Sequence, residues 1–208
     1  NITIYQPSVK PLYKDFSLEE LEEYPADTLF HLAAYYNPNP INHHEEELLE
    51  ESNFNFPHSL CNVLKNNGLK RIISLSSYLQ LLDSKYKSLY SETKSRFVDW
   101  ANAEFEVSEI FLFDTFGKND QRGKVLDVFI RNSISSHDIY IPSTRVDINL
   151  TNVEEVADSL INSLNLTPGQ YMIMSNNHLT IKELAESIVS MERTSTKIKA
   201  TLEGSNLI

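Results

Sequence analysis

Short apolar runs alternate with helical patterns through the first half of this 208-residue chain. Residues 27–34, 69–77 and 107–113 have the nearly continuous apolar character of strands that are buried on both faces. Residues 47–66 and 84–105, which lie between these runs, have the spacing of helices with one apolar face. Strands that alternate with helices predict βαβ units. The expected fold class is therefore α/β, with a Rossmann-like parallel sheet.

The second half of the chain has shorter elements. Its patterns predict three helices, at residues 124–134, 152–164 and 180–191. They also predict two strands, at residues 138–142 and 171–174. We therefore expect two domains. Residues 1–118 would form the sheet domain, and residues 119–208 a small C-terminal α/β lobe, some of whose elements return to the sheet. Such a lobe would cover the carboxyl ends of the strands, where α/β folds bind ligands.

Composition excludes several classes of function. The formal net charge of −11 argues against binding to nucleic acid or to an anionic membrane, because both need clustered positive charge. No apolar run approaches the roughly 20 residues of a membrane span. The single cysteine, Cys61, lies among apolar residues, so we expect a core position, no internal disulfide and a cytoplasmic location. We expect no metal site, because the adjacent residues of the His43–Glu47 run point in different directions.

Tyr90 and Lys94 carry the strongest chemical signal. A tyrosine and a lysine four residues apart share one face of a helix. A fixed ammonium beside a phenol would lower the reference pKa of about 10 toward neutrality. A serine from the end of the preceding apolar run, Ser76 or Ser77, would then polarise a carbonyl while the tyrosine gives or takes a proton. This is the chemistry of ketone and alcohol interconversion, although the bare spacing is also common on ordinary amphipathic helices.

Several further segments decide between these two interpretations. In sequence order, they are His31-Leu-Ala-Ala34, Asn53, the run from Gly68 to Ser77, Tyr90-Ser-Glu-Thr-Lys94, Phe116-Gly117 and Leu179-Thr-Ile-Lys-Glu-Leu-Ala185. With these segments in this order, the chain resembles the extended short-chain dehydrogenase/reductase family, which comprises nucleotide-sugar epimerases, dehydratases and ketoreductases. The resemblance covers roughly residues 1 to 190.

The resemblance implies roles for the central residues. Ser77 would orient the substrate oxygen, with Ser76 as the alternative if the register differs by one. Tyr90 would be the acid or base. Lys94 would bind the nicotinamide ribose of NAD or NADP and lower the pKa of the tyrosine.

Three more residues receive supporting roles from the resemblance. Ala33 and Ala34 would line the dinucleotide through their backbone. Asn53 would support the site from behind, the alternative being an asparagine on the helix surface. The first domain would accordingly be the dinucleotide-binding domain, and the second would mainly bind substrate.

The chain also departs from the family pattern. The first strand, the glycine-rich turn and the first helix would precede Asn1, and residues 1–6 resemble the second strand. We therefore expect either the retained part of a longer protein or a short relative without cofactor. The Arg-x-x-Asn segment of the family is replaced here by Phe111-Leu-Phe-Asp114, and no Asp-Glu pair follows Ser77. Dehydration of the sugar is therefore disfavoured.

Substrate contacts are expected from both domains. The candidates are Ser76, Ser77, Asp114, Arg122 and Arg145. Arg122, with Lys124, would meet a substrate diphosphate, and Arg145 is a second phosphate candidate. An exposed loop without such a role is the alternative for Arg122 and Lys124.

The resulting prediction is an enzyme that reduces a 4-keto-6-deoxy sugar nucleotide for surface polysaccharide (O-antigen) or lipopolysaccharide biosynthesis, similar to abequose-synthase-type enzymes. One alternative is a nucleotide-sugar 4-epimerase with tightly bound NAD. The other is a catalytically silent relative that acts as a binding partner. Family members pair the helix before Gly68 with the Tyr90 helix, so we expect a homodimer in which Phe97 and Trp100 serve the interface.

Overall fold

The structure, a computed structural model, describes residues 18–21, 25–118, 120, 123–176 and 178–201. It divides into two compact units. The first unit extends to Leu112 and takes in Asn162–Met172, and the second comprises Phe113–Ile161 and the chain from Ile173 onward. The change of unit thus follows Leu112 rather than residue 118. The strand expected within residues 1–6 lies outside the described residues.

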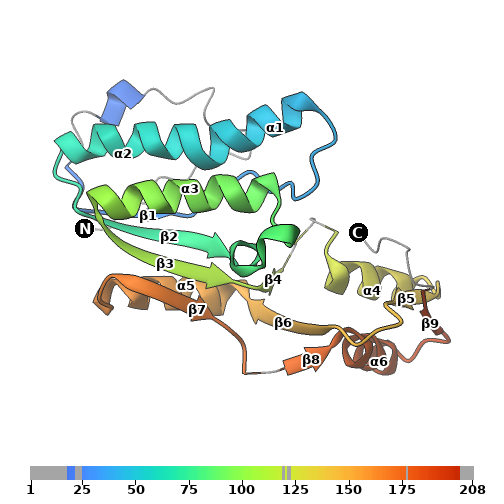
Figure 1. The fold of residues 1–208 in the computed structure, drawn as a ribbon. Helices are drawn as coiled ribbons and strands as arrows, with labels where there is room; N and C mark the ends of the chain where they lie inside the picture. Colours follow the sequence, from blue (N-terminus) through green and yellow to red (C-terminus); the bar gives the residue numbers. More distant parts are fainter. Residues whose placement is uncertain (1–17, 22–24, 119, 121–122, 177, 202–208) are drawn as a thin grey trace. The chain divides into compact units, whose positions relative to one another are not determined.

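A four-stranded sheet organises the first unit (Figure 1). Its strands lie in the order β1 (Thr28–His31), β2 (Arg71–Ser77), β3 (Glu106–Leu112) and β7 (Gly169–Ile173). β1 pairs with β2, and β2 with β3, in parallel. The predicted α/β class with a parallel sheet is confirmed, and β7 is an element of the later chain that returns to this sheet.

Helices cover one face of this sheet. The run from His43 to Asn66 is continuous and contains α1 (His43–Glu50), a π-helical turn η3 (Glu51–Asn55) and α2 (Phe56–Asn66). This run lies alongside α3 (Leu89–Glu104), and α3 lies next to the strands (Figure 1). Short 3-10 turns occupy Leu18–Leu21, Tyr78–Leu81 (η4), Ser84–Tyr86 and Ser163–Asn165.

The expected helix at residues 84–105 begins later than its apolar pattern indicates. Ser88 is the N-cap of α3, because its Oγ accepts a hydrogen bond from the backbone N–H of Ser91. A serine at this position satisfies one of the free amides of the first helical turn. The cap fixes where α3 starts, and thereby which turn of the helix carries Tyr90.

The core of the first unit lies between the helices and the sheet. Its buried members are Cys61, Leu64, Leu69, Ile72, Phe97, Val98, Ala101 and Val107. Cys61 is a core residue, as predicted, and burial raises its pKa to about 12. The placement of Phe97 at a dimer interface is wrong, because its ring is buried in this core.

Arg71 ties the returning segment to the sheet. Its guanidinium donates hydrogen bonds to the carbonyl oxygens of Ser163, Leu164 and Leu166 at distances of 3.0, 2.8 and 2.6 Å. It also donates to Ser108 Oγ on β3 at 3.2 Å. One planar cation thus satisfies the carbonyl groups at the end of a short helical turn.

The second unit has its own sheets and core. One sheet contains β4 (Asp114–Phe116), β6 (Asp147–Asn152) and β8 (His178–Thr180), and a second pairs β5 (Ile139–Ile141) with β9 (Ile198–Ala200). The helices are α4 (Val125–Ile134), α5 (Val153–Asn162) and α6 (Ile181–Glu192). The buried core consists of Phe129, Ile139, Ile141, Ile148, Leu184, Ala185 and Ile188. The predicted helices are confirmed, whereas β4, β6, β8 and β9 were not predicted.

Gly117, from the Phe116-Gly117 pair, is held by packing in the second unit. A Cβ at this position would lie 2.6 Å from Cγ1 of Val153, so a larger residue fits only if the side chain of Val153 shifts. None of the described helices is long and apolar enough to cross a membrane.

Candidate active site

The two serines lie at the carboxyl end of β2, where the strand passes into η4. Ser77 is the N-cap of this turn. Its Oγ accepts a hydrogen bond from the N–H of Leu79 at 3.3 Å, and its N–H donates to Oε1 of Gln80 at 2.9 Å. This reciprocal pair is a capping box, which fixes the hydroxyl of Ser77 at the end of the strand.

Tyr90 comes from the first turn of α3 and meets Ser77. Its side chain is buried, with 6% of its surface exposed, and it forms a hydrogen bond with the side chain of Ser77. The ring of Tyr36, from the loop after β1, stands edge-on to the Tyr90 ring with centroids 5.0 Å apart. The expected Ser77–Tyr90 pair is therefore formed within the first unit, whereas Ser76 has a different partner.

The acidity of Tyr90 differs from the expectation. Burial raises its pKa to about 12, Tyr36 adds to this increase, and the hydrogen bond with Ser77 opposes it. Lys94 does not contribute to this shift, so the predicted lowering of the pKa is wrong. The reason is that burial disfavours the phenolate more than its neighbours favour it. Tyr90 is therefore a neutral phenol at neutral pH.

Lys94 lies one turn after Tyr90 and is also buried, with 6% exposed. Burial lowers its pKa to about 8, and the negative charge of Glu109 opposes this shift. Within the described part of the chain, the Lys94 ammonium has neither an ion pair nor a hydrogen bond. A buried ammonium is costly without polar partners. This position therefore suits a group that accepts hydrogen bonds from an ammonium.

His31 is the last residue of β1, and it interacts electrostatically with Lys94. Burial lowers its pKa to about 3, and the positive charge of Lys94 lowers it further. Its ring packs edge-on against Phe97, with centroids 4.7 Å apart. His31 is therefore a neutral, packed imidazole at neutral pH.

Asn53 is buried inside the π-helical turn and is not a surface asparagine. Its Oδ1 accepts a hydrogen bond from Tyr35 N at 2.8 Å, and its Nδ2 donates to Tyr35 O at 3.0 Å. The same Nδ2 reaches Thr93 Oγ1 on α3 at 3.4 Å. One amide thus clamps the loop that carries Tyr36 against the helix that carries Tyr90. π-Helical turns are often found at functional sites.

Ser76 points to a buried polar cluster that the sequence interpretation missed. Its Oγ donates to Oε1 of Glu109 on β3 at 2.8 Å. Nε2 of Gln80 donates to the same oxygen at 3.3 Å, and Nε2 of Gln170 donates to Oε2 at 2.8 Å. The sequence did hold a signal for this cluster, because Glu109 interrupts the apolar run at residues 107–113.

The other predicted residues of the first unit are Ala33 and Ala34. Both lie just after β1, separated from it by Leu32, and both are exposed. Small residues at the carboxyl end of a parallel strand leave room for a ligand to approach the backbone.

The remaining substrate candidates belong to the second unit or lie outside the described residues. Asp114 is on β4, and its carboxylate lies 3.9 Å from Nζ of Lys124. Arg145 is exposed and donates to Oδ1 of Asp147 at 2.7 Å through Nη2, which raises the pKa of the arginine. Arg122 lies outside the described residues.

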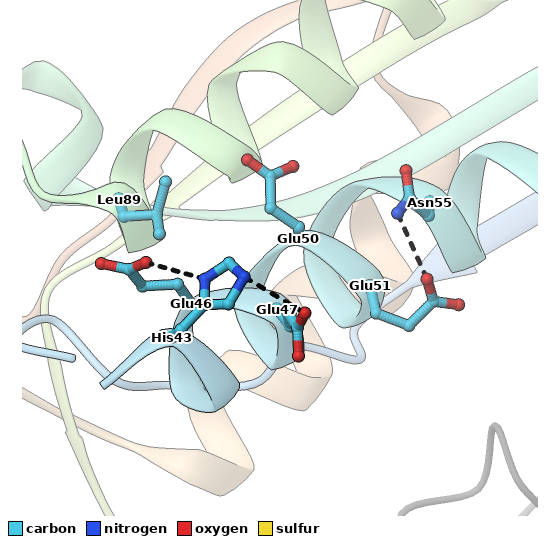
Figure 2. A pocket seen from close by; sticks show the side chains of 7 residues that line it. All are labelled: His43, Glu46, Glu47, Glu50, Glu51, Asn55 and Leu89. Atoms are coloured by element: carbon cyan, nitrogen blue, oxygen red, sulfur yellow. Dashed lines mark hydrogen bonds and ion pairs between the residues drawn. The ribbon is translucent and has the colours of Figure 1, made fainter. Parts of the chain in front are cut away.

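An open groove has neither Ser77 nor Tyr90 among its lining residues (Figure 2). Its lining residues are His43, Glu46, Glu47, Glu50, Glu51, Asn55 and Leu89. The His43 ring lies between Glu46 and Glu47, as Figure 2 shows. Four carboxylates would repel a diphosphate, so this groove does not suit a nucleotide. Among the described residues, no three His, Cys, Asp or Glu side chains gather closely enough to hold a metal ion.

The fold resembles that of several solved nucleotide-sugar enzymes. A UDP-N-acetylglucosamine 4-epimerase from Methanobrevibacter ruminantium, in complex with UDP-N-acetylmuramic acid, matches with a TM-score of 0.75 and 20% identity, over 95% of this chain and 71% of that one. A UDP-glucuronic acid 4-epimerase from Bacillus cereus, in complex with NAD, matches with a TM-score of 0.76 and 13% identity, over 90% and 67% of the two chains. The chain has the fold of these epimerases.

A third solved structure contains NADPH instead of NAD. RMD from Pseudomonas aeruginosa, complexed with NADPH, matches with a TM-score of 0.72 and 16% identity, over 89% of this chain and 73% of that one. No protein-family model matches the sequence, and no curated protein matches it. The resemblance to the extended short-chain dehydrogenase/reductase family is thus confirmed at the level of the fold.

Proposed function

We propose that this chain is an NAD(P)-dependent nucleotide-sugar enzyme that interconverts a sugar ketone and an alcohol at Ser77, Tyr90 and Lys94. The observation that carries the proposal is the hydrogen-bonded Ser77–Tyr90 pair, with the buried Lys94 one helical turn away. Similar solved structures bind UDP-sugars, NAD or NADPH, which supports the same ligand classes here.

The residues of the first unit fit the nicotinamide end of the cofactor. Lys94 presents a buried ammonium that has no hydrogen bond and no close ion pair among the described residues, and the hydroxyls of a ribose would accept its hydrogen bonds. Ala33 and Ala34 leave space at the end of β1. The described residues contain no glycine-rich turn, so the proposal concerns only the nicotinamide end of the dinucleotide.

Reduction is the direction that the site favours. NAD(P)H, when bound, supplies a hydride to the carbonyl carbon of the substrate. Ser77 donates a hydrogen bond to the carbonyl oxygen, and Tyr90 gives that oxygen its proton. Because the pKa of Tyr90 is raised to about 12, the phenol already carries this proton at neutral pH. The finer proposal, which the sequence resemblance suggests, is reduction of a 4-keto-6-deoxy sugar nucleotide for O-antigen synthesis in the cytoplasm.

A 4-epimerase is the second candidate, and it is favoured by the comparisons, since the UDP-sugar enzymes named above are 4-epimerases. Epimerisation begins with oxidation, in which Tyr90 must first accept a proton. A pKa of about 12 opposes that step unless bound cofactor lowers it.

A substrate screen separates the two candidates from a silent binding protein. The full-length protein is incubated with nucleotide 4-keto-6-deoxy sugars and with UDP-sugars, each with NADH and with NADPH. A reductase is expected to consume reduced cofactor, measured at 340 nm, in proportion to product. An epimerase is expected to convert UDP-sugars to their C4 epimers without net consumption. If neither substrate class turns over and neither cofactor raises the melting temperature, the proposal is wrong.

We also propose a homodimer that pairs the α1–α2 run and α3 across two copies. Trp100 on α3 is half-buried and packs against His58 on α2, with ring centroids 4.3 Å apart, so it lies beside the helices that would form the interface. Sedimentation velocity at micromolar concentration is expected to give twice the chain mass. A single species at the mass of one chain would exclude the dimer.

A further inference from the structure

Glu109 is a carboxylate buried in the sheet next to the candidate site, with 5% of its surface exposed. It lies on β3, directly opposite Ser74 of β2. Residues two apart on a strand share a face, so Ser76 lies on the same face as Ser74 and reaches Glu109. A buried carboxylate needs hydrogen bonds or a countercharge to offset its lost hydration.

Hydrogen bonds connect Glu109 to the serine that meets Tyr90. Oε1 of Glu109 accepts from Nε2 of Gln80 at 3.3 Å. Oε1 of the same glutamine accepts from the N–H of Ser77 at 2.9 Å. Because an amide has a distinct donor and acceptor end, the carboxylate fixes which way Gln80 is turned. That orientation presents the oxygen that Ser77 needs.

Charge connects Glu109 to Lys94. Two ionisable side chains interact electrostatically with Lys94, His31 from β1 and Glu109 from β3, and Tyr90 lies one turn earlier on its own helix. His31 is neutral over the working pH range, since burial and Lys94 lower its pKa to about 3. Glu109 is therefore the negative charge that favours a protonated Lys94.

We propose that Glu109 is a positioning residue for the candidate reaction: its buried carboxylate orients Ser77 through Gln80 and keeps Lys94 charged. It does not touch the reacting atoms. Glu109 acts on the orientation of Ser77 through Gln80, and on the charge of Lys94 through its own negative charge. The two effects can be measured separately. The assignment rests on the proposed function for its catalytic consequence, but not for its effect on the charge of Lys94.

The first test uses Glu109→Gln, which keeps the size of the side chain and removes its charge. Burial lowers the pKa of Lys94, and the charge of Glu109 opposes this shift, so the variant is expected to lower the pKa of Lys94 further, by about 1 unit or more. The alkaline limb of kcat/KM, which reports the free enzyme, moves to lower pH by the same amount. The matched control is Glu106→Gln, an exposed glutamate on the same strand, which leaves the limb in place.

A second measurement needs no turnover. Lys94 has a folded pKa of about 8 and an unfolded value of about 10.4. The unfolded chain therefore binds more protons between these values, so the free energy of unfolding rises with pH in this window. Urea unfolding followed by the fluorescence of Trp100 measures this rise, and Glu109→Gln is expected to start it at lower pH. An unchanged onset would overturn the charge effect even if no substrate is ever found.

The hydrogen-bond effect has its own variant. Gln80→Leu removes the bridge to Ser77 and leaves the charge of Glu109, so kcat falls about 10-fold while the alkaline limb stays in place. Wild-type kcat in this variant contradicts the orienting role. If Glu109→Gln does not fold, Glu109→Asp keeps the charge with a shorter reach. It should lower kcat without moving the limb, and a moved limb or full kcat would overturn the assignment.

Discussion

Tyr90→Phe is expected to lower kcat for the proposed reduction by about 10²- to 10⁴-fold, the range that a positioned general acid supplies. This corresponds to about 3 to 5 kcal/mol of transition-state stabilisation. The substitution removes only the hydroxyl that meets Ser77, and the phenylalanine ring keeps the edge-on contact with Tyr36. Folding and cofactor affinity should therefore change little.

Two measurements distinguish loss of the proton donor from general damage to the active site. Initial rates with a 4-keto sugar nucleotide give kcat, and the rise in melting temperature with NADPH gives cofactor binding. The expected combination is a strongly reduced kcat with a nearly unchanged temperature rise. Tyr86→Phe is the matched control, because Tyr86 is an exposed tyrosine that precedes α3 by only a few residues. A Tyr90→Phe variant that retains activity within twofold would show that another group supplies the proton.

The sequence predicted the frame of the first unit well because its signals are local. The runs at residues 69–77 and 107–113 are apolar enough to indicate buried strands, and β2 and β3 occupy nearly the same residues. The contact between Ser77 and Tyr90 was predicted correctly, because the order of the family segments along the chain indicates which strand end lies next to which helix. The π-helical turn at Glu51–Asn55 was not predictable, because an added residue in a helix leaves the apolar pattern almost unchanged.

The errors concern burial and charge, which depend on the tertiary structure. Helical spacing places Lys94 near Tyr90, but it does not tell how much water each side chain loses. Desolvation is the largest cause of both pKa shifts, and it moves the pKa of Tyr90 up rather than down. Glu109 was missed for a related reason. A single carboxylate in a strand has no motif, and its partners Gln80 and Gln170 come from distant parts of the chain.

His31 is expected to make the first unit sensitive to mild acid. Its folded pKa is about 3, and its unfolded value is about 6.5. Between these pH values the unfolded chain binds a proton at His31 and the folded chain does not. The free energy of unfolding therefore falls as the pH falls. From pH 7 to pH 4.5 this single group removes about 2.5 kcal/mol from the free energy of unfolding. The full difference, reached near pH 3, amounts to about 4 to 5 kcal/mol.

Urea unfolding at several pH values between 7 and 4.5 measures this loss. Trp100 is the only tryptophan of the chain and belongs to the first unit, so its fluorescence follows the unit that contains His31. In His31→Gln the side chain no longer titrates. The variant is expected to be less stable at pH 7, because the ring contact with Phe97 is lost, but to lose little further stability on acidification.

His137→Gln is the matched control, because this histidine is exposed and lies in the second unit. It should keep the wild-type slope. Acidic side chains, whose unfolded pKa values are about 3.9 to 4.3, also begin to contribute near pH 4.5, but they are the same in all three proteins, so the contribution of His31 is the difference in slope between them. If His31→Gln retains the wild-type slope over the measured pH range, the acid sensitivity comes from another group, and His31 is not held neutral by burial beside Lys94.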